Sequence, residues 1–161
     1  MGDSPDRLAA RMQSEGEKTA AFFEVLTPEA WQLQVYEAGT CWTVRQILAH
    51  FVSTEGGFGD LMENILSGGA GTPDDFDIDR YNERHVADLN ARETGELIEL
   101  YRAARQENIH LVQGMQPADL ERQGRHPFLG VVPLEEIVKL LYRHNQIHLR
   151  DVRRLMNPAQ S

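Results

Sequence analysis

A single helical stripe near the C-terminus limits the folds open to this chain. Residues three or four apart lie on one face of a helix, and one such face is apolar except at two histidines. Its members are Ile137, Leu141, His144, His148, Val152 and Leu155. An apolar helix face is buried, so both imidazoles are expected to point into a helical core. Two imidazoles buried side by side are unfavourable unless each finds a partner, and one metal ion would serve both.

The rest of the chain follows the same helical period in long segments. A first helix is expected over about residues 6–25. A second starts after Thr43 and ends before Gly68. A third runs from about residue 90 or 91 to 115, and a fourth from about 133 to 155 or 156. Four long amphipathic helices predict an all-α four-helix bundle, with residues 1–161 as one domain.

Two helix starts carry clear capping signals. Ser4 is placed as an N-cap with Pro5 at the first helical position, where its missing N–H costs nothing. Thr43 followed by Gln46 forms a capping box, in which each side chain binds the other residue's backbone amide. Trp42 precedes this box and is positioned as part of a hydrophobic staple with Ile47. These signals fix the register of the first two helices.

The connections differ in length and character. Residues 27–30 form a turn or a short helix, and residues 68–78 are rich in Gly and Asp and form a loop. A short extra helix is expected over residues 79–89. Residues 116–132 are expected to be irregular, because Val131-Val132 is too short to indicate a strand. The long second connection allows a crossover between helices.

Composition and charge exclude several classes of protein. The chain is 41% hydrophobic and 25% charged, which is typical of globular proteins. No apolar run is long enough for a transmembrane helix, and the N-terminus does not resemble a signal peptide, so a cytoplasmic location is expected. A net charge of −9, spread along the chain, argues against nucleic acid as a partner. The single cysteine, Cys41, excludes an internal disulfide and a Cys-rich zinc site.

A third histidine has a setting similar to the pair. His50 follows Ile47 by three residues, and Thr54 and Gly57 continue its side of the helix. If the second and fourth helices are neighbours, His50 meets His144 and His148. Three neutral imidazoles then bind one divalent cation and leave a coordination position open, as in catalytic zinc sites. The alternative is that the histidines are ordinary core or surface residues without a metal.

The remaining polar candidates have weaker settings. His85 is expected near the surface or at a site mouth, His110 at the edge of the core, and His126 in a loop. Glu55 is a candidate catalytic carboxylate, although it lies five residues after His50 and therefore off that face. Asp151 either orients an imidazole from behind or forms an ordinary surface salt bridge with a nearby arginine.

The predicted second helix contains three glycines just beyond His50. Gly56, Gly57 and Gly59 lie inside a predicted helix, where each costs roughly 1 kcal/mol relative to Ala. Such a cluster indicates a close helix contact, room for a ligand, a kink or an early end of the helix. Cys41 lies before the helix cap and away from the inner face, so it is interpreted as an ordinary small residue.

With these residues in view, the chain resembles the DinB / YfiT-like superfamily of metal-binding four-helix bundles. Trp42–Phe51 resembles its second-helix motif, and His144–His148 resembles the H-x-x-x-H of its last helix. Asp77–Asn82 is similar to a segment found in mycothiol-dependent maleylpyruvate isomerase N-terminal domains. The resemblance implies a site of His50, His144 and His148 for zinc, nickel or another divalent metal, and often a homodimer.

The same resemblance implies a small-molecule substrate, such as a low-molecular-weight thiol. Characterised relatives are thiol S-transferases that use bacillithiol or mycothiol, isomerases or hydrolases, and fold alone does not decide among them. Three hypotheses follow for this chain. It is a metal-dependent S-transferase or hydrolase, a non-catalytic protein that binds a metal or small ligand, or a metal-free helical dimerisation module.

Overall fold

The four predicted long helices are present in the computed structural model, which describes residues 2–158. They are α1 (Pro5–Glu24), α3 (Val44–Leu66), α5 (Thr94–Gln113) and α6 (Leu134–Met156). The shorter elements are α2 (Pro28–Trp31), α4 (Ile78–Asp88), the 3-10 helix η1 (Pro117–Glu121), and the strands β1 (Gln123–His126) and β2 (Gly130–Pro133). The fold is a helical bundle, and the predicted short extra helix is α4. Within residues 2–158, no helix is both long enough and apolar enough to cross a membrane.

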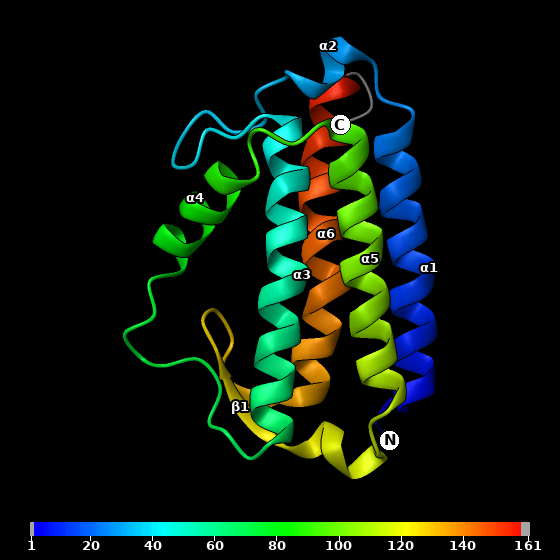
Figure 1. Ribbon diagram of the computed structural model, residues 1–161, viewed down its shortest axis with the longest axis vertical. Helices are drawn as coiled ribbons and strands as arrows, with labels where there is room; N and C mark the ends of the chain where they lie inside the picture. Colours follow the sequence, from blue (N-terminus) through cyan, green and yellow to red (C-terminus); the bar gives the residue numbers. More distant parts are fainter. Residues whose placement is uncertain (1, 159–161) are drawn as a thin grey trace.

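The order of helices around the bundle differs from their order in the chain. Both α1 and α3 pack against α5 and α6, so α1 and α3 occupy opposite corners. In Figure 1, α3 and α5 run in the same direction because the connection between them returns along the length of the bundle. The arrangement therefore contains the long return connection that the sequence allowed. Its consequence is that α3 lies beside α6, which the His50 hypothesis required.

Both predicted helix starts are confirmed. The Ser4 side chain accepts a hydrogen bond from the Arg7 amide, and Pro5 opens α1. Thr43 and Gln46 form the full capping box at the start of α3. From that start α3 continues without a break to Leu66. The kink or early end considered at the glycine cluster is therefore absent.

The prediction that residues 116–132 contain no strand is wrong. β1 and β2 form an antiparallel hairpin, with Gly124 opposite Val132 and His126 opposite Gly130. Gly130 has a φ of 72°, a left-handed conformation that glycine adopts without strain. Each strand has only four residues, too few for an alternating pattern. Backbone bonds from Arg125 to the 68–78 loop support the hairpin, and a local reading of the sequence could not detect them.

The third long helix begins at Thr94, later than predicted. Residues 90–93 form a turn instead, in which the Asn90 and Arg92 amides bind carbonyls of the preceding residues. Arg45 of α3 holds this turn by donating to the Asn90 side chain and to the Arg92 carbonyl. A contact between distant segments thus overrides the helical pattern at this end.

The buried side chains form two apolar clusters. One lies where the N-terminal part of α1 meets the C-terminal part of α3, and includes Met12 and Met62. The other lies toward the opposite ends of these helices, and includes Phe23 and Phe51. A polar layer separates residues of the two clusters along α1, α3 and α5. Its centre is an ion pair between Arg105 and Glu55, whose side chains are 4% and 1% exposed.

This buried ion pair is fully bonded. Arg105 donates to Glu55 through Nε and Nη2, at 3.0 and 2.6 Å, and to the Met12 carbonyl through Nη1. Asn108 donates to the other carboxylate oxygen of Glu55 at 2.9 Å. Gly16 makes room for the arginine, because a Cβ there would lie 3.0 Å from the Arg105 Cγ. The network therefore joins α1, α3 and α5 through satisfied polar groups.

Replacing Arg105 by Met should destabilise the protein strongly. The Glu55 carboxylate would be left buried without its counter-charge, which costs roughly 3–5 kcal/mol. Arg102→Met is the matched control on the same helix, because Arg102 pairs with Glu24 at a more exposed position. Loss of such a surface pair costs under about 1 kcal/mol. Urea unfolding of both variants measures the difference, and equal losses would contradict a structural role for the pair.

Candidate metal centre

Helices α3 and α6 bring the three predicted histidines together. The Nε2 atom of His144 lies 3.0 Å from Nε2 of His50 and 3.1 Å from Nε2 of His148. All three ligand atoms lie within 4.8 Å of one another. His50 is buried, and His144 and His148 are partly buried. The imidazoles thus converge on one point through the same ring nitrogen.

The helix geometry explains this convergence. His144 and His148 are one turn apart on α6, on the stripe whose members Ile137, Leu141 and Val152 are buried as predicted. Leu155, at the end of that stripe, is 38% exposed and lies outside the core. His50 reaches the pair from α3, whose register the Thr43 capping box sets.

Aromatic rings contact the three histidines on the core side. The Trp42 ring lies 4.7 Å from the His50 ring, measured between centroids. The Phe51 ring lies 5.8 Å from both His144 and His148. These rings shield the imidazoles from water on the core side. Low local polarity strengthens any electrostatic interaction at the point where the nitrogens meet.

A hydrogen-bonded chain behind His148 fixes which of its nitrogens carries the proton. The Tyr36 hydroxyl lies 2.7 Å from Nδ1 of His148 and donates to Asp151 at 2.9 Å. Tyr36 has one hydroxyl proton, and Asp151 accepts it. Nδ1 of His148 must therefore donate to Tyr36, which leaves the lone pair of Nε2 facing the other two imidazoles.

The three Nε2 atoms cannot all be satisfied by protons. His148 presents a lone pair, so His144 can satisfy it only by donating through Nε2. Nδ1 of His144 is then a bare acceptor, and this atom is buried without a hydrogen-bond partner among the described residues. If His144 instead carries its proton on Nδ1, two lone pairs face each other at 3.1 Å. Either arrangement leaves polar atoms unsatisfied, which is costly in a buried site.

The environment keeps the imidazoles neutral. Burial, with the nearby His148 as the next cause, lowers the pKa of His144 to about 3. Burial and the two neighbouring imidazoles hold the pKa of His50 well below its usual range. Burial also lowers the pKa of His148, against the opposing effect of Asp151. Neutral imidazole is the form that binds metals.

This donor set fits a divalent cation. Three neutral nitrogens point at one centre, and the cation would partner lone pairs that protons cannot satisfy together. Three protein ligands are also the number found in catalytic zinc sites, which keep one position open. The Tyr36–Asp151 chain corresponds to the carboxylate partners that orient ligating histidines in such sites. The three-histidine group could therefore hold a metal.

The two candidate carboxylates lie in different settings. Asp151 acts on His148 through Tyr36, and its other oxygen lies 3.5 Å from Arg150, so both interactions considered for it occur together. Glu55 is held by Arg105 and Asn108 in the buried polar layer. No hydrogen bond of the described residues joins Glu55 to the histidines.

The other three histidines lie outside the cluster. His85 lies against Tyr81 with the two rings tilted and their centroids 3.9 Å apart, and His110 is exposed and bonded to Gln106. His126 is buried in β1, where its Nδ1 accepts from the Phe128 and Leu129 amides. Burial lowers the pKa of His126 to about 4. The prediction that His126 lies in a loop is wrong, because it is the last residue of β1, and no sequence pattern indicated its burial.

No sequence pattern identified Tyr36 as a residue that lies beside the histidines. This residue lies between α2 and α3, in a segment whose ends pair when Val35 and Val44 donate to the Trp42 and Leu33 carbonyls. That pairing carries the Tyr36 ring to within 5.9 Å of the His148 ring. A lone tyrosine in a connection has no periodic neighbours, so only the folded segment reveals its position.

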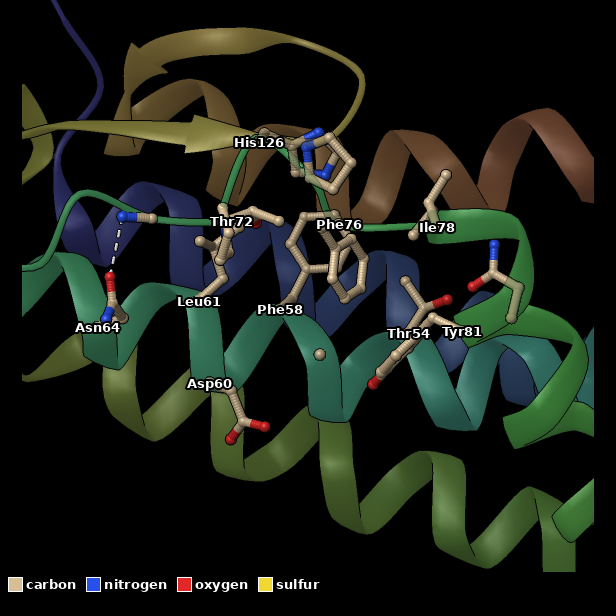
Figure 2. A pocket seen from close by; sticks show the side chains of 15 residues that line it. Thr54, Phe58, Asp60, Leu61, Asn64, Thr72, Phe76, Ile78, Tyr81 and His126 are labelled. Carbon is tan, nitrogen blue, oxygen red and sulfur yellow. Dashed lines mark hydrogen bonds between the residues drawn. The ribbon is translucent and has the colours of Figure 1, made fainter.

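A cavity of about 310 Å³ lies along α3, beginning one helical turn beyond His50, and none of His50, His144 and His148 is among its lining residues. Thr54 lines it, and the Thr54 hydroxyl lies 3.4 Å from Nδ1 of His50. The cavity lies between α3, α4, the 68–78 loop and the hairpin (Figure 2). It follows the His50 side of α3, and Thr54 lies between it and His50.

A family model described as the DinB superfamily matches residues 11–152. The chain belongs to the DinB superfamily. The match extends from α1 to α6 and includes all three histidines. No similar sequence was found among curated proteins.

Solved structures share the fold of this DinB superfamily chain. YfiT from Bacillus subtilis, described as a probable metal-dependent hydrolase with an unusual four-helix bundle topology, is 18% identical with a TM-score of 0.79. That match covers 97% of this chain and 87% of YfiT. A mycothiol-dependent maleylpyruvate isomerase is 12% identical with a TM-score of 0.75, covering 93% of this chain and 61% of that protein.

A third structure widens the range of functions on this fold. The colibactin self-resistance protein ClbS, solved in complex with double-stranded DNA, is 13% identical with a TM-score of 0.73. The match covers 100% of this chain and 98% of ClbS. At these identities the likeness shows the fold, and the DinB superfamily chain's own residues must indicate its chemistry.

In metal-free protein at neutral pH, His148 should carry its ring proton on Nδ1. The Tyr36–Asp151 chain demands this tautomer, and Tyr36→Phe should allow the Nε2-protonated form to appear. Long-range ¹H–¹⁵N correlation spectra of the histidine rings measure both states. Tyr142→Phe is the control, because Tyr142 lies on the same helix within the other core cluster. A proton on Nε2 of His148 in the unaltered protein would contradict the proposed chain.

Proposed function

We propose that this chain is a metal-dependent enzyme in which His50, His144 and His148 hold one divalent cation, zinc or nickel. The observation that carries the proposal is the meeting of three Nε2 atoms at 3.0 and 3.1 Å with too few protons to satisfy them. A purely structural cluster would be expected to pair every buried polar atom.

The chain's own residues would prepare the site for reaction. Tyr36 and Asp151 hold the His148 ring so that its Nε2 faces the centre. Burial and the hydrogen bond to Asp151 raise the pKa of Tyr36, so its hydroxyl keeps the proton that this chain needs. Trp42 and Phe51 exclude water from the core side. When bound, a divalent metal supplies a lowered pKa for a water or thiol at the open position.

Two reactions use this chemistry on a small-molecule substrate. A thiol S-transferase attacks an electrophile with an activated thiol, and a hydrolase attacks with activated water. The similarity to a mycothiol-dependent isomerase supports a thiol, and the similarity to YfiT, a probable metal-dependent hydrolase, supports water. The cavity beside Thr54 offers room for the substrate in either case.

We also propose a homodimer located in the cytoplasm. Phe128, Leu129 and Val131 expose 74%, 42% and 57% of their surface on the hairpin, and together they offer an apolar surface to a second copy. Nucleic acid is not proposed as a partner, because the net charge of −9 opposes phosphate binding. Analytical ultracentrifugation distinguishes the monomer from the dimer.

Protein purified without a histidine tag should bind one zinc or nickel ion per chain. His144→Ala should lose this metal, because two imidazoles bind far more weakly than three. His110→Ala is the matched control, since His110 is exposed and bonded only to Gln106. Elemental analysis and thermal shift with added zinc measure the effect. Full metal content in the His144→Ala protein would overturn the site.

Metal-loaded protein should accelerate either thiol conjugation or hydrolysis. Bacillithiol, mycothiol and glutathione are tested against a model electrophile, and a nitrophenyl ester is tested without thiol. His50→Ala should lose both metal and turnover, whereas His85→Ala should keep its metal. Absence of turnover in every assay at full metal loading would contradict the enzyme and favour the non-catalytic binding protein.

A further inference from the structure

The cavity along α3 has a lining that bears on the substrate. On α3 the residues His50, Thr54, Gly57, Phe58 and Leu61 follow one another at helical spacing, so the floor of the cavity continues the His50 face. Thr54 joins the two, because it lines the cavity and its hydroxyl lies 3.4 Å from Nδ1 of His50. The cavity therefore begins one helical turn beyond His50, on the Nδ1 side of its ring.

The lining is predominantly aromatic and apolar. Phe58 stacks on His126 with centroids 5.5 Å apart, and Phe76 packs against Tyr81 at 5.4 Å. Figure 2 shows these rings gathered around the space between α3 and the overlying segments. Flat aromatic walls favour a flat apolar occupant, since rings stack at these separations.

The charges of the lining residues also restrict which molecule the cavity can hold. None of the described residues that line the cavity is Lys or Arg. Asp60 is the carboxylate among them; it is exposed, and in Figure 2 it turns away from the rings. His126 is neutral at pH 7, because burial lowers its pKa to about 4. An anionic group entering this space would lose its water and find no cationic partner.

Neutral hydrogen-bonding groups remain available for orientation. Thr54 lies at the end next to His50, and the Tyr81 hydroxyl lies over Gly57, 3.3 Å from where a Cβ would stand. Burial raises the pKa of Tyr81, so this hydroxyl stays protonated and able to donate. The absence of a side chain at Gly57 leaves the space in front of it open.

We propose that this cavity is the substrate pocket and that it takes an uncharged molecule carrying an aromatic ring. The assignment names the substrate class of the metal site, and in that respect it rests on the proposed function. It also separates this chain from an enzyme whose substrate is a carboxylate anion, because such a substrate needs basic side chains that this lining does not supply.

The first test compares two probes of matched shape. The probes are 2-naphthylmethanol, which is uncharged, and 2-naphthoate, which is an anion at pH 7. Titrations followed by ¹H–¹⁵N spectra of the metal-free and zinc-loaded protein give both affinities. We expect the alcohol to bind at least about tenfold more tightly than the anion, because a buried unpaired carboxylate is costly. Equal or tighter binding of the anion to the metal-free protein would overturn the charge assignment.

The second test locates the binding with two glycine variants. Gly57→Leu puts a side chain into the cavity beside Tyr81, whereas Gly56→Leu is the matched control, because a Cβ at Gly56 meets nothing within 4 Å. Binding of 2-naphthylmethanol should weaken at least about tenfold in the first variant and stay within about twofold in the second. Both substitutions favour the helix, so both proteins should fold. Unchanged binding in Gly57→Leu would place the probe elsewhere and overturn the pocket.

These outcomes distinguish a failure of the pocket proposal from a failure of the metal-site proposal. Zinc loading with no binding of 2-naphthylmethanol overturns the pocket and leaves the metal site standing. Binding that depends on Gly57 in a protein that takes up no metal supports the pocket and overturns the proposed function. Metal content is therefore measured on every sample used in the titrations.

Discussion

The meeting of three neutral imidazoles at one point is the interaction on which the arrangement of this protein depends. It requires α3 to lie beside α6, because His50 comes from one helix and His144 and His148 from the other. It also requires a chain of hydrogen bonds behind His148, so that the lone pair of its Nε2 faces inward. A segment of irregular structure between α2 and α3 supplies that chain through Tyr36. The bundle is therefore built around a cluster that its own protons cannot satisfy.

The path of the backbone then creates a cavity along α3, one helical turn beyond His50. Because α3 and α5 run in the same direction, the connection between them must return along the bundle (Figure 1). The returning segment includes the 68–78 loop and α4, which together with the hairpin cover the His50 side of α3. Gly57 leaves that side open beneath Tyr81. The topology that makes α3 and α6 neighbours thus also provides the cavity along α3.

Periodicity predicted those parts of the structure that depend on local sequence. The stripe containing His144 and His148 identified the pair, and the capping signals at Ser4 and Thr43 fixed two helix starts. His50 needed knowledge of which helices are neighbours, and the family resemblance supplied it. The hairpin and the late start of α5 escaped prediction, because Arg125 and Arg45 hold them through contacts with distant segments. Tyr36 escaped because a tyrosine in a connection belongs to no pattern.

The bundle contains two buried polar clusters, the network around Glu55 and the three histidines. They differ in whether their hydrogen-bonding groups are satisfied within the protein. Around Glu55, each carboxylate oxygen has a donor, and Arg105 donates through all three of its nitrogens. Such a network is complete without a ligand, so it holds α1, α3 and α5 together and offers no free group for chemistry. The histidine cluster is incomplete, since its inward-facing Nε2 lone pairs exceed the protons available between them. A protein keeps an incomplete buried cluster at a cost in stability, and a cation bound by the three Nε2 atoms would offset that cost. Glu55 therefore supports the scaffold through this network, its catalytic role stays a prediction, and the three histidines are the proposed centre of the chemistry.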